Sequence, residues 1–183
     1  MKELSLNILD IAQNSIHAEA RLVRILITES DETLKLEIMD DGKGMSEEFL
    51  NRVTDPFSTT RTTRKVGMGL PLLKLAAEQT GGSMSVTSRE RALYPETHGT
   101  EVTAVFYKKH LDFTPLGDVI STVVSLVQGS PEVDFLFVHE LGEKRVELDT
   151  RDIREVLGDV PLSSPDVLVW IRESLIEQYG YSE

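Results

Sequence analysis

Three short polar and glycine-rich motifs follow one another in the first 70 residues, each beside the kind of element it would need. Asn14 lies in a helical pattern, Asp40 precedes a glycine turn at residues 40–44, and a second glycine turn at residues 67–70 precedes another helical pattern. Each motif on its own could be an ordinary surface amide or a simple turn. In this order they predict a Mg-nucleotide site, which needs a metal ligand, an acceptor for a base and a cradle for phosphates.

Hydrophobic periodicity predicts the elements that carry these motifs. Helices are expected over residues 2–18, 46–53 and 70–80, and strands over residues 21–28, 33–39, 83–88 and 99–107. Residues 55–66 show no such periodicity and are expected to form a loop. The order of helix, hairpin, helix, hairpin predicts an α+β fold, a two-layer sandwich with helices on one face of a mixed β-sheet.

Residues 111–183 have a pattern of their own and carry no motif that suggests chemistry. They are expected to form a small C-terminal α/β segment after a first domain at residues 1–110, either as a domain of its own or as a flank of the first. Within it, helices are expected over residues 118–127, 151–158 and 164–178, and a hairpin from residues 133–140 and 144–148.

The net charge of −12 is concentrated in this C-terminal segment, which has 5 basic and 15 acidic side chains. Its net charge of −10 disfavours nucleic-acid binding, because such binding depends on neutralising phosphates. Two interpretations stay open: a solvated surface, or a docking surface for a basic partner.

The composition excludes several classes of site. The chain has no cysteine, so disulfides, thiolate metal sites and cysteine nucleophiles are excluded. No apolar run approaches the roughly 20 residues of a membrane span, and the first residues give no signal peptide. A cytoplasmic protein without a membrane partner is expected.

The first helix offers three candidate site residues. Asn14 can give Mg²⁺ an oxygen ligand of the hard kind that this ion prefers. Asp10 lies one turn earlier on the same face and could orient or deprotonate a water aimed at a γ-phosphate. His17 could touch a phosphate oxygen. The alternative is that all three are ordinary polar residues of a helix surface or end.

Asp40 ends a strand, where a buried carboxylate can accept a hydrogen bond from the exocyclic amino group of adenine. Gly42 and Gly44 permit a positive φ and a close approach of the backbone. The alternative is a simple turn, since Asp-Gly is a common turn pair.

The second glycine turn would supply the phosphate contacts. Backbone N–H groups at the start of a helix, together with its dipole, can cradle phosphates. This role is predicted for Gly67, Met68, Gly69 and Leu70, with Thr60, Arg64 and Lys65 of the preceding loop joining the site. The spacing fits neither a Walker loop nor a dinucleotide-binding fingerprint.

Together these stretches resemble the Bergerat-fold (GHKL) ATPases, which include sensor histidine kinases, type II topoisomerases, mismatch-repair ATPases and the ninety-kilodalton chaperone. The resemblance covers residues 4–107: an N box at 6–15, glycine boxes at 40–45 and 67–72, and an F box with the start of an ATP lid at 55–60. Residues 67–88 look most like a histidine kinase. The resemblance implies ATP and Mg²⁺ as cofactors, with Asn14 for the metal, Asp40 for adenine and Thr100 beside it.

Two functions follow as expectations from this resemblance. Asp10 stands where kinases usually carry Asn and hydrolytic members usually carry Glu, and none of the four histidines lies on a phosphoacceptor segment. The first function is an ATP-dependent kinase module without its own phosphoacceptor domain, which transfers phosphate to a separate protein in signalling. The alternative is a switch in which ATP binding or slow hydrolysis controls assembly with a regulatory partner.

Overall fold

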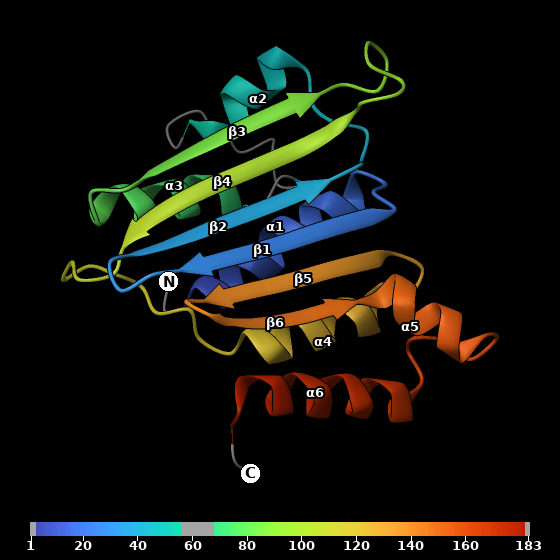
Figure 1. The fold of residues 1–183 in the computed structure, drawn as a ribbon. Coiled ribbons are helices and arrows are strands. Elements are labelled where there is room, and N and C mark those ends of the chain that lie inside the picture. Colours follow the sequence, from blue (N-terminus) through green and yellow to red (C-terminus); the bar gives the residue numbers. More distant parts are fainter. Residues whose placement is uncertain (1–2, 56–67, 182–183) are drawn as a thin grey trace.

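The computed structural model describes residues 3–55 and 68–181, and Figure 1 shows how their elements are arranged. The strands are β1 (Leu22–Glu29), β2 (Thr33–Asp40), β3 (Ser83–Arg89), β4 (Gly99–Tyr107), β5 (Asp134–Leu141) and β6 (Lys144–Asp149). The helices are α1 (Leu4–His17), α2 (Glu47–Thr54), α3 (Gly69–Gln79), α4 (Val119–Gly129), α5 (Thr150–Leu157) and α6 (Pro165–Tyr179).

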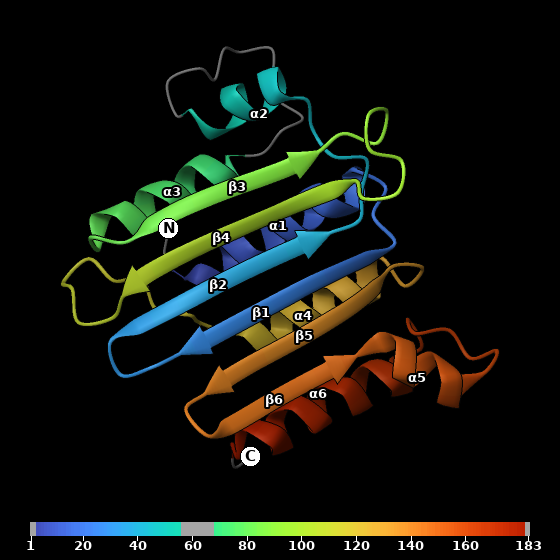
Figure 2. The same ribbon diagram turned by 45° about the horizontal axis from the view of Figure 1, so that its top comes forward.

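All six strands belong to one mixed sheet, in the order β3-β4-β2-β1-β5-β6. Only the β1–β5 pair is parallel among the described strands; the other neighbours are antiparallel. Figures 1 and 2 show α1, α3 and α4 behind the same face of this sheet. The predicted fold class, an α+β sandwich with helices on one face of a mixed sheet, is confirmed.

The alternation of side chains along β1 determines which face becomes the core. Val23, Ile25 and Ile27 are buried, whereas Arg24 and Thr28 on the other face are exposed and Leu26 is partly buried. Successive residues of a strand point to opposite faces, so this pattern places three branched apolar side chains under the helices.

Residues beyond 110 continue this sheet and its core. In the parallel pair, Phe135 of β5 lies opposite Val23 and Phe137 lies opposite Ile25, and all four side chains are buried. Helix α4 packs against α1. The C-terminal segment therefore completes the side of the sheet that β1 would otherwise leave as an edge. Across residues 3–55 and 68–181, no helix has both the length and the hydrophobicity to span a bilayer.

The outer edge of β6 is covered by a side chain from α6. The Gln178 Oε1 atom accepts a hydrogen bond from the Glu147 backbone N at 2.8 Å, and its Nε2 donates to the Glu147 carbonyl at 3.0 Å. The amide of Gln178 thus pairs with the strand as a neighbouring peptide group would.

A buried polar network joins β1, β5 and α6. The His139 Nε2 donates to the Glu29 carboxylate at 2.9 Å, while the hydroxyl of Tyr179 lies 2.6 Å from His139 Nδ1. The Lys108 ammonium donates to the second Glu29 oxygen at 2.7 Å. The hydrogen bond from His139 is the largest cause that lowers the pKa of Glu29 to about 2, with further lowering by Lys108 and opposition from burial.

We expect Glu29→Gln to lower the free energy of unfolding by about 1–3 kcal/mol at neutral pH, because it weakens charge-assisted hydrogen bonds to the buried His139 and the partly buried Lys108. The folded pKa of Glu29 lies below its ordinary value of 4.5. Its stabilisation is therefore complete above pH 4.5 and is lost as the pH falls towards about 2. Urea unfolding at a series of pH values measures both effects.

The exposed Glu32, changed to Gln, is the matched control and should follow the wild type. Across the acid window the wild type should lose more stability than Glu29→Gln. Parallel pH dependences of wild type and Glu29→Gln would contradict the stabilising role of the Glu29 charge.

Candidate functional site

A cavity of about 930 Å³ lies between α1, the ends of β2 and β4, the loop after β2 and the start of α3. Its apolar lining includes Ile11, Ile38, Met45, Phe49, Leu70 and Val102. Its polar lining includes Asn14, Ser15, His17, Asp40, Lys43 and Thr100. The cavity thus has the size of a small-molecule site, with largely apolar walls and a few polar groups.

Asp40 is the last residue of β2, and its two carboxylate oxygens are held separately. The Ser15 hydroxyl donates to Oδ2 at 2.6 Å, and the Gly42 N–H donates to Oδ1 at 2.8 Å. Burial raises the pKa of Asp40 above its ordinary value of 3.8, and the hydrogen bonds from Ser15 and Gly42 oppose that shift. A backbone hydrogen bond from Thr100 also lowers the pKa of this carboxyl, so the carboxylate is fixed in position from three sides.

Strand pairing places Thr100 of β4 directly opposite Asp40. The Thr100 hydroxyl lies 2.8 Å from the Ser88 hydroxyl, which also accepts a hydrogen bond from the Met45 N–H at 2.8 Å. This chain of polar contacts fixes the side of the cavity next to Asp40.

Two glycines let the loop after β2 run close to other backbone segments. Gly44 has φ +70°, and a Cβ atom there would lie 2.0 Å from the carbonyl oxygen of Arg89. A Cβ on Gly42 would lie 2.8 Å from the carbonyl oxygen of Ala18. Glycine is therefore required at both positions for close approach, and at Gly44 for the backbone conformation as well.

The predicted residues of α1 take different places. Asn14 is partly buried and lines the cavity, and His17 is exposed at its rim. Asp10 is exposed and lies outside the lining, next to the first turn of α3. A Cβ built on Gly69 would be 3.2 Å from the Asp10 Cβ, so the two helices are nearly in backbone contact there.

The structure brings Asn14, His17, Asp40, Gly44, Leu70 and Thr100 together around one cavity. Four further predicted residues, Asp10, Gly42, Met68 and Gly69, lie outside its lining. Gly42 supports Asp40, Gly69 is buried in the first turn of α3, and Met68 is exposed before it. The remaining predicted residues, Thr60, Arg64, Lys65 and Gly67, lie outside the described residues.

Ser15, Ser88 and Lys43 also contribute to this site, although their sequence positions alone did not predict it. Ser15 lies four residues after Ile11 on the buried side of α1, and a small hydroxyl in such a stripe was the available signal. Lys43 stands between two glycines that the motif had already marked. Ser88 was not distinguishable from the other serines and threonines of β3.

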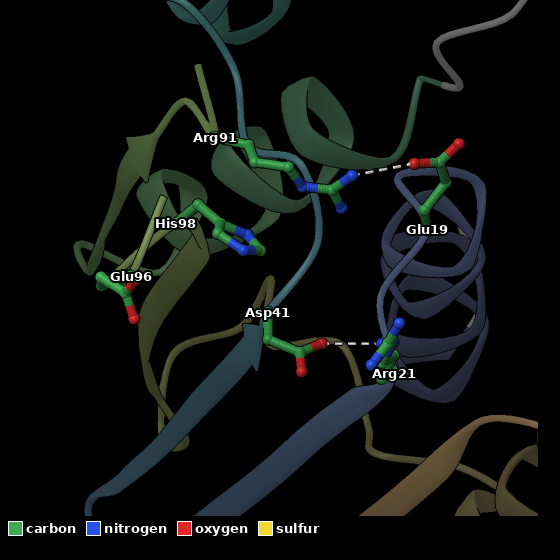
Figure 3. Close-up of a pocket in the computed structure, with 6 residues that line it drawn as sticks. All are labelled: Glu19, Arg21, Asp41, Arg91, Glu96 and His98. Atoms are coloured by element: carbon green, nitrogen blue, oxygen red, sulfur yellow. Dashed lines mark hydrogen bonds and ion pairs between the residues drawn. The ribbon is translucent and has the colours of Figure 1, made fainter. Parts of the chain in front are cut away.

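A second cavity of about 590 Å³ lies beside the same loop, and Figure 3 shows its lining. His98 Nδ1 donates to the Gly42 carbonyl at 2.6 Å, and Asp41 Oδ1 accepts from the backbone N–H groups of Arg21 and Leu22 at 2.7 and 2.9 Å. These bonds hold the loop from outside while Asp40 is held from within the first cavity. The loop is consequently fixed on both sides.

We expect Gly44→Ala to reduce the free energy of unfolding by about 1–3 kcal/mol more than Gly142→Ala does, because only the former forces a Cβ into a backbone carbonyl. Both glycines have positive φ values, +70° and +61°, so backbone strain is common to the pair. A Cβ at Gly142 meets no atom within 4 Å. Urea unfolding measures the free energy of unfolding of both variants. Equal losses of stability would show that the contact with the Arg89 carbonyl adds no cost to the substitution of Gly44.

Comparisons with known proteins agree with this geometry. Residues 1–110 match the family described as "Histidine kinase-, DNA gyrase B-, and HSP90-like ATPase". The chain is 31% identical over 109 residues to Sporulation kinase A of Bacillus subtilis (strain 168), covering 60% of this chain and 17% of that protein. It is 29% identical over 85 residues to the sensor histidine kinase ZraS of Escherichia coli (strain K12), covering 45% of this chain and 18% of that protein. The chain thus spans less than a fifth of the length of either kinase.

Among solved structures, the Aquifex aeolicus MutL ATPase domain complexed with ADP aligns with a TM-score of 0.53 and 15% identity, covering 98% of this chain and 70% of that one. At this identity the likeness concerns the fold, and it extends through residues beyond 110. The family match covers more than half of the chain and includes the elements that surround Asp40. The chain belongs to the histidine kinase-, DNA gyrase B- and HSP90-like ATPases, the GHKL superfamily.

Proposed function

We propose that the chain binds ATP with Mg²⁺ in the cavity around Asp40 and transfers the γ-phosphate to a separate protein. Nucleotide binding is supported chiefly by the Asp40 carboxylate, which Ser15 and Gly42 hold in place between the apolar walls of the cavity. The apolar lining suits the faces of a flat base. The carboxylate suits an amino group on the edge of that base.

This arrangement favours adenine over guanine. The exocyclic amino group of adenine donates a hydrogen bond to Asp40, whereas guanine presents a carbonyl oxygen at the corresponding position. A carbonyl facing a carboxylate would leave both acceptors without a donor, and a mismatch of this kind strongly disfavours the wrong ligand.

The metal would depend on the nucleotide for most of its ligands. No group of three or more His, Asp or Glu residues in the described ranges is arranged to hold an ion. Mg²⁺ usually keeps several waters and binds through one or two protein ligands together with phosphates. A single oxygen from Asn14, which lines the cavity, fits that mode of binding.

The phosphates would extend towards the start of α3. The helix begins at Gly69, where unsatisfied N–H groups and the helix dipole favour an anion. His17 is exposed at the rim of the cavity and could contact the same group. Contacts from Thr60, Arg64, Lys65 and Gly67 stay predictions.

The kinase function is supported by the sequence relatives, which are named as kinases. A second candidate, slow ATP hydrolysis that controls assembly with a partner, is favoured by the place of Asp10. This exposed carboxylate lies beside the first turn of α3, where it could accept a proton from a water aimed at the γ-phosphate.

We expect Asp40→Asn to raise the ATP dissociation constant at least tenfold, about 1.4 kcal/mol, because an acceptor becomes a mixed donor and acceptor. Isothermal titration calorimetry with ATP, ADP and GTP measures this change and the preference for adenine. Asp41→Asn is the matched control, since Asp41 also accepts backbone hydrogen bonds but lines the other cavity. Equal losses in both variants would point to a disturbed loop and would contradict the adenine role of Asp40.

We expect Asp10→Asn to abolish ATP hydrolysis while changing ATP affinity less than threefold, about 0.6 kcal/mol, because the residue lies outside the cavity lining. Asp10→Glu, which keeps the carboxylate, should retain hydrolysis. Release of labelled phosphate from γ-labelled ATP measures the rate. Undiminished hydrolysis in Asp10→Asn would remove Asp10 from the reaction.

The same labelled ATP separates the two functions when candidate partner proteins are added. Label that appears on a partner supports phosphate transfer, and loss of that label in Asp40→Asn would link it to this site. Label found only as free phosphate supports the switch.

A further inference from the structure

Helix α6 carries an apolar pair on the side that faces away from the molecule. Its buried residues Val167, Ile171, Leu175 and Tyr179 form one stripe, and the helix packs on β6 and α4. Val169 and Trp170 lie on the opposite side, and each is 54% exposed. Figures 1 and 2 show α6 as the outermost helix next to the β6 edge, so its outward side faces solvent.

Three carboxylates surround this pair. The positions of Asp166, Val169, Trp170, Glu173 and Glu177 repeat at intervals of three or four residues, which places them on one face of a helix. All five are exposed. We refer to these five residues as the α6 face.

The acidic residues of the α6 face differ from other acidic residues of the C-terminal segment. Glu140, Glu147, Asp149 and Asp134 each form an ion pair with an arginine of that segment. Within the described residues, Asp166, Glu173 and Glu177 form no ion pair. The face therefore combines an exposed aromatic side chain with three carboxylates that form no ion pair within the described residues, although Arg172, whose guanidinium donates to the Ser121 hydroxyl, precedes Glu173 on the same helix.

We propose that the α6 face binds a basic segment of a partner protein, with apolar side chains of that segment on Val169 and Trp170. Tryptophan is among the residues that contribute most at protein interfaces when a partner covers it. The surrounding carboxylates would pair with lysine or arginine of the partner. This inference goes beyond the proposed function and does not depend on it.

Charge complementarity favours a basic partner segment, rather than a second copy of the chain, on the α6 face. Residues 111–183 carry a net charge of −10, which attracts a basic segment over distance and speeds its association. Two α6 faces brought together would oppose three carboxylates to three others, and like charges in contact disfavour association. The β6 edge lies at the opposite end of the strand order from β3 and β4, so a partner there leaves the cavity around Asp40 accessible.

The test uses the chain's single tryptophan as the reporter. The probe is a synthetic amphipathic peptide of lysine and leucine without tryptophan, titrated into the whole chain at low salt while Trp170 emission is recorded. We expect a blue shift of the emission, with a dissociation constant on the order of 10 µM that weakens as salt is added. A peptide with glutamate in place of lysine should give no shift.

Variants decide whether the α6 face is responsible. Glu173→Lys should weaken binding at least tenfold, whereas Glu132→Lys, the same charge change on an exposed residue before β5, should weaken it less than threefold. Val169→Ser should also weaken binding, whereas Leu111→Ser, at a residue 96% exposed elsewhere on the surface, should not. Circular dichroism confirms that each variant is folded.

Three outcomes would overturn the proposal. The first is absence of an emission change with the lysine peptide. The second is equal weakening by Glu132→Lys and Glu173→Lys, which would mean that any acidic surface suffices. The third is a dimer in sedimentation velocity that Trp170→Ser dissociates, since this would assign the α6 face to a second copy of the chain.

Discussion

The antiparallel register between β2 and β4 is the constraint on which the candidate site depends. It sets Asp40 opposite Thr100, and the buried residues Ile38 and Val102 opposite each other two positions earlier. A shift of one residue would turn the apolar side chains of β2 to the solvent face, because the side-chain period of a strand is two. The core therefore fixes the register, and the register fixes the carboxylate at the edge of the cavity.

The loop after β2 is held in one conformation beside Asp40, and this gives the cavity a defined shape. Its backbone is held by Asp40 from the cavity, by His98 from the β3–β4 connection and by the Asp41 contacts to the start of β1. The start of β1 and the β3–β4 connection, which are distant in sequence from each other, thus meet at one short loop. Such a loop is pre-organised, so a ligand would bind with a smaller loss of conformational freedom.

Much of the fold could be predicted from local patterns. The apolar patterns of β1, β2 and α1 predicted the correct elements. The helix expected over residues 46–53 corresponds to α2, whose N-cap Ser46 accepts a hydrogen bond from the Phe49 N–H at 3.2 Å. The parallel pairing of β1 with β5 could not be predicted, because neither strand carries a local signal for its partner. The bond from Ser15 to Asp40 depends on the rotation of α1 against the sheet, and the contact of Glu29 with His139 depends on that parallel register. Features of this kind arise from tertiary packing.

The pairing of Gln178 with Glu147 has a consequence for how the sheet can grow. An edge strand is a template for another chain wherever its N–H and C=O groups have no partner. At Glu147 both groups are already bonded to the amide of Gln178, so an incoming strand cannot hydrogen-bond to β6 there without displacing the end of α6. Strand addition is therefore directed to the other edge, β3, where Ser83, Ser85 and Thr87 have exposed side chains. The two ends of this sheet are not equivalent as sites of aggregation.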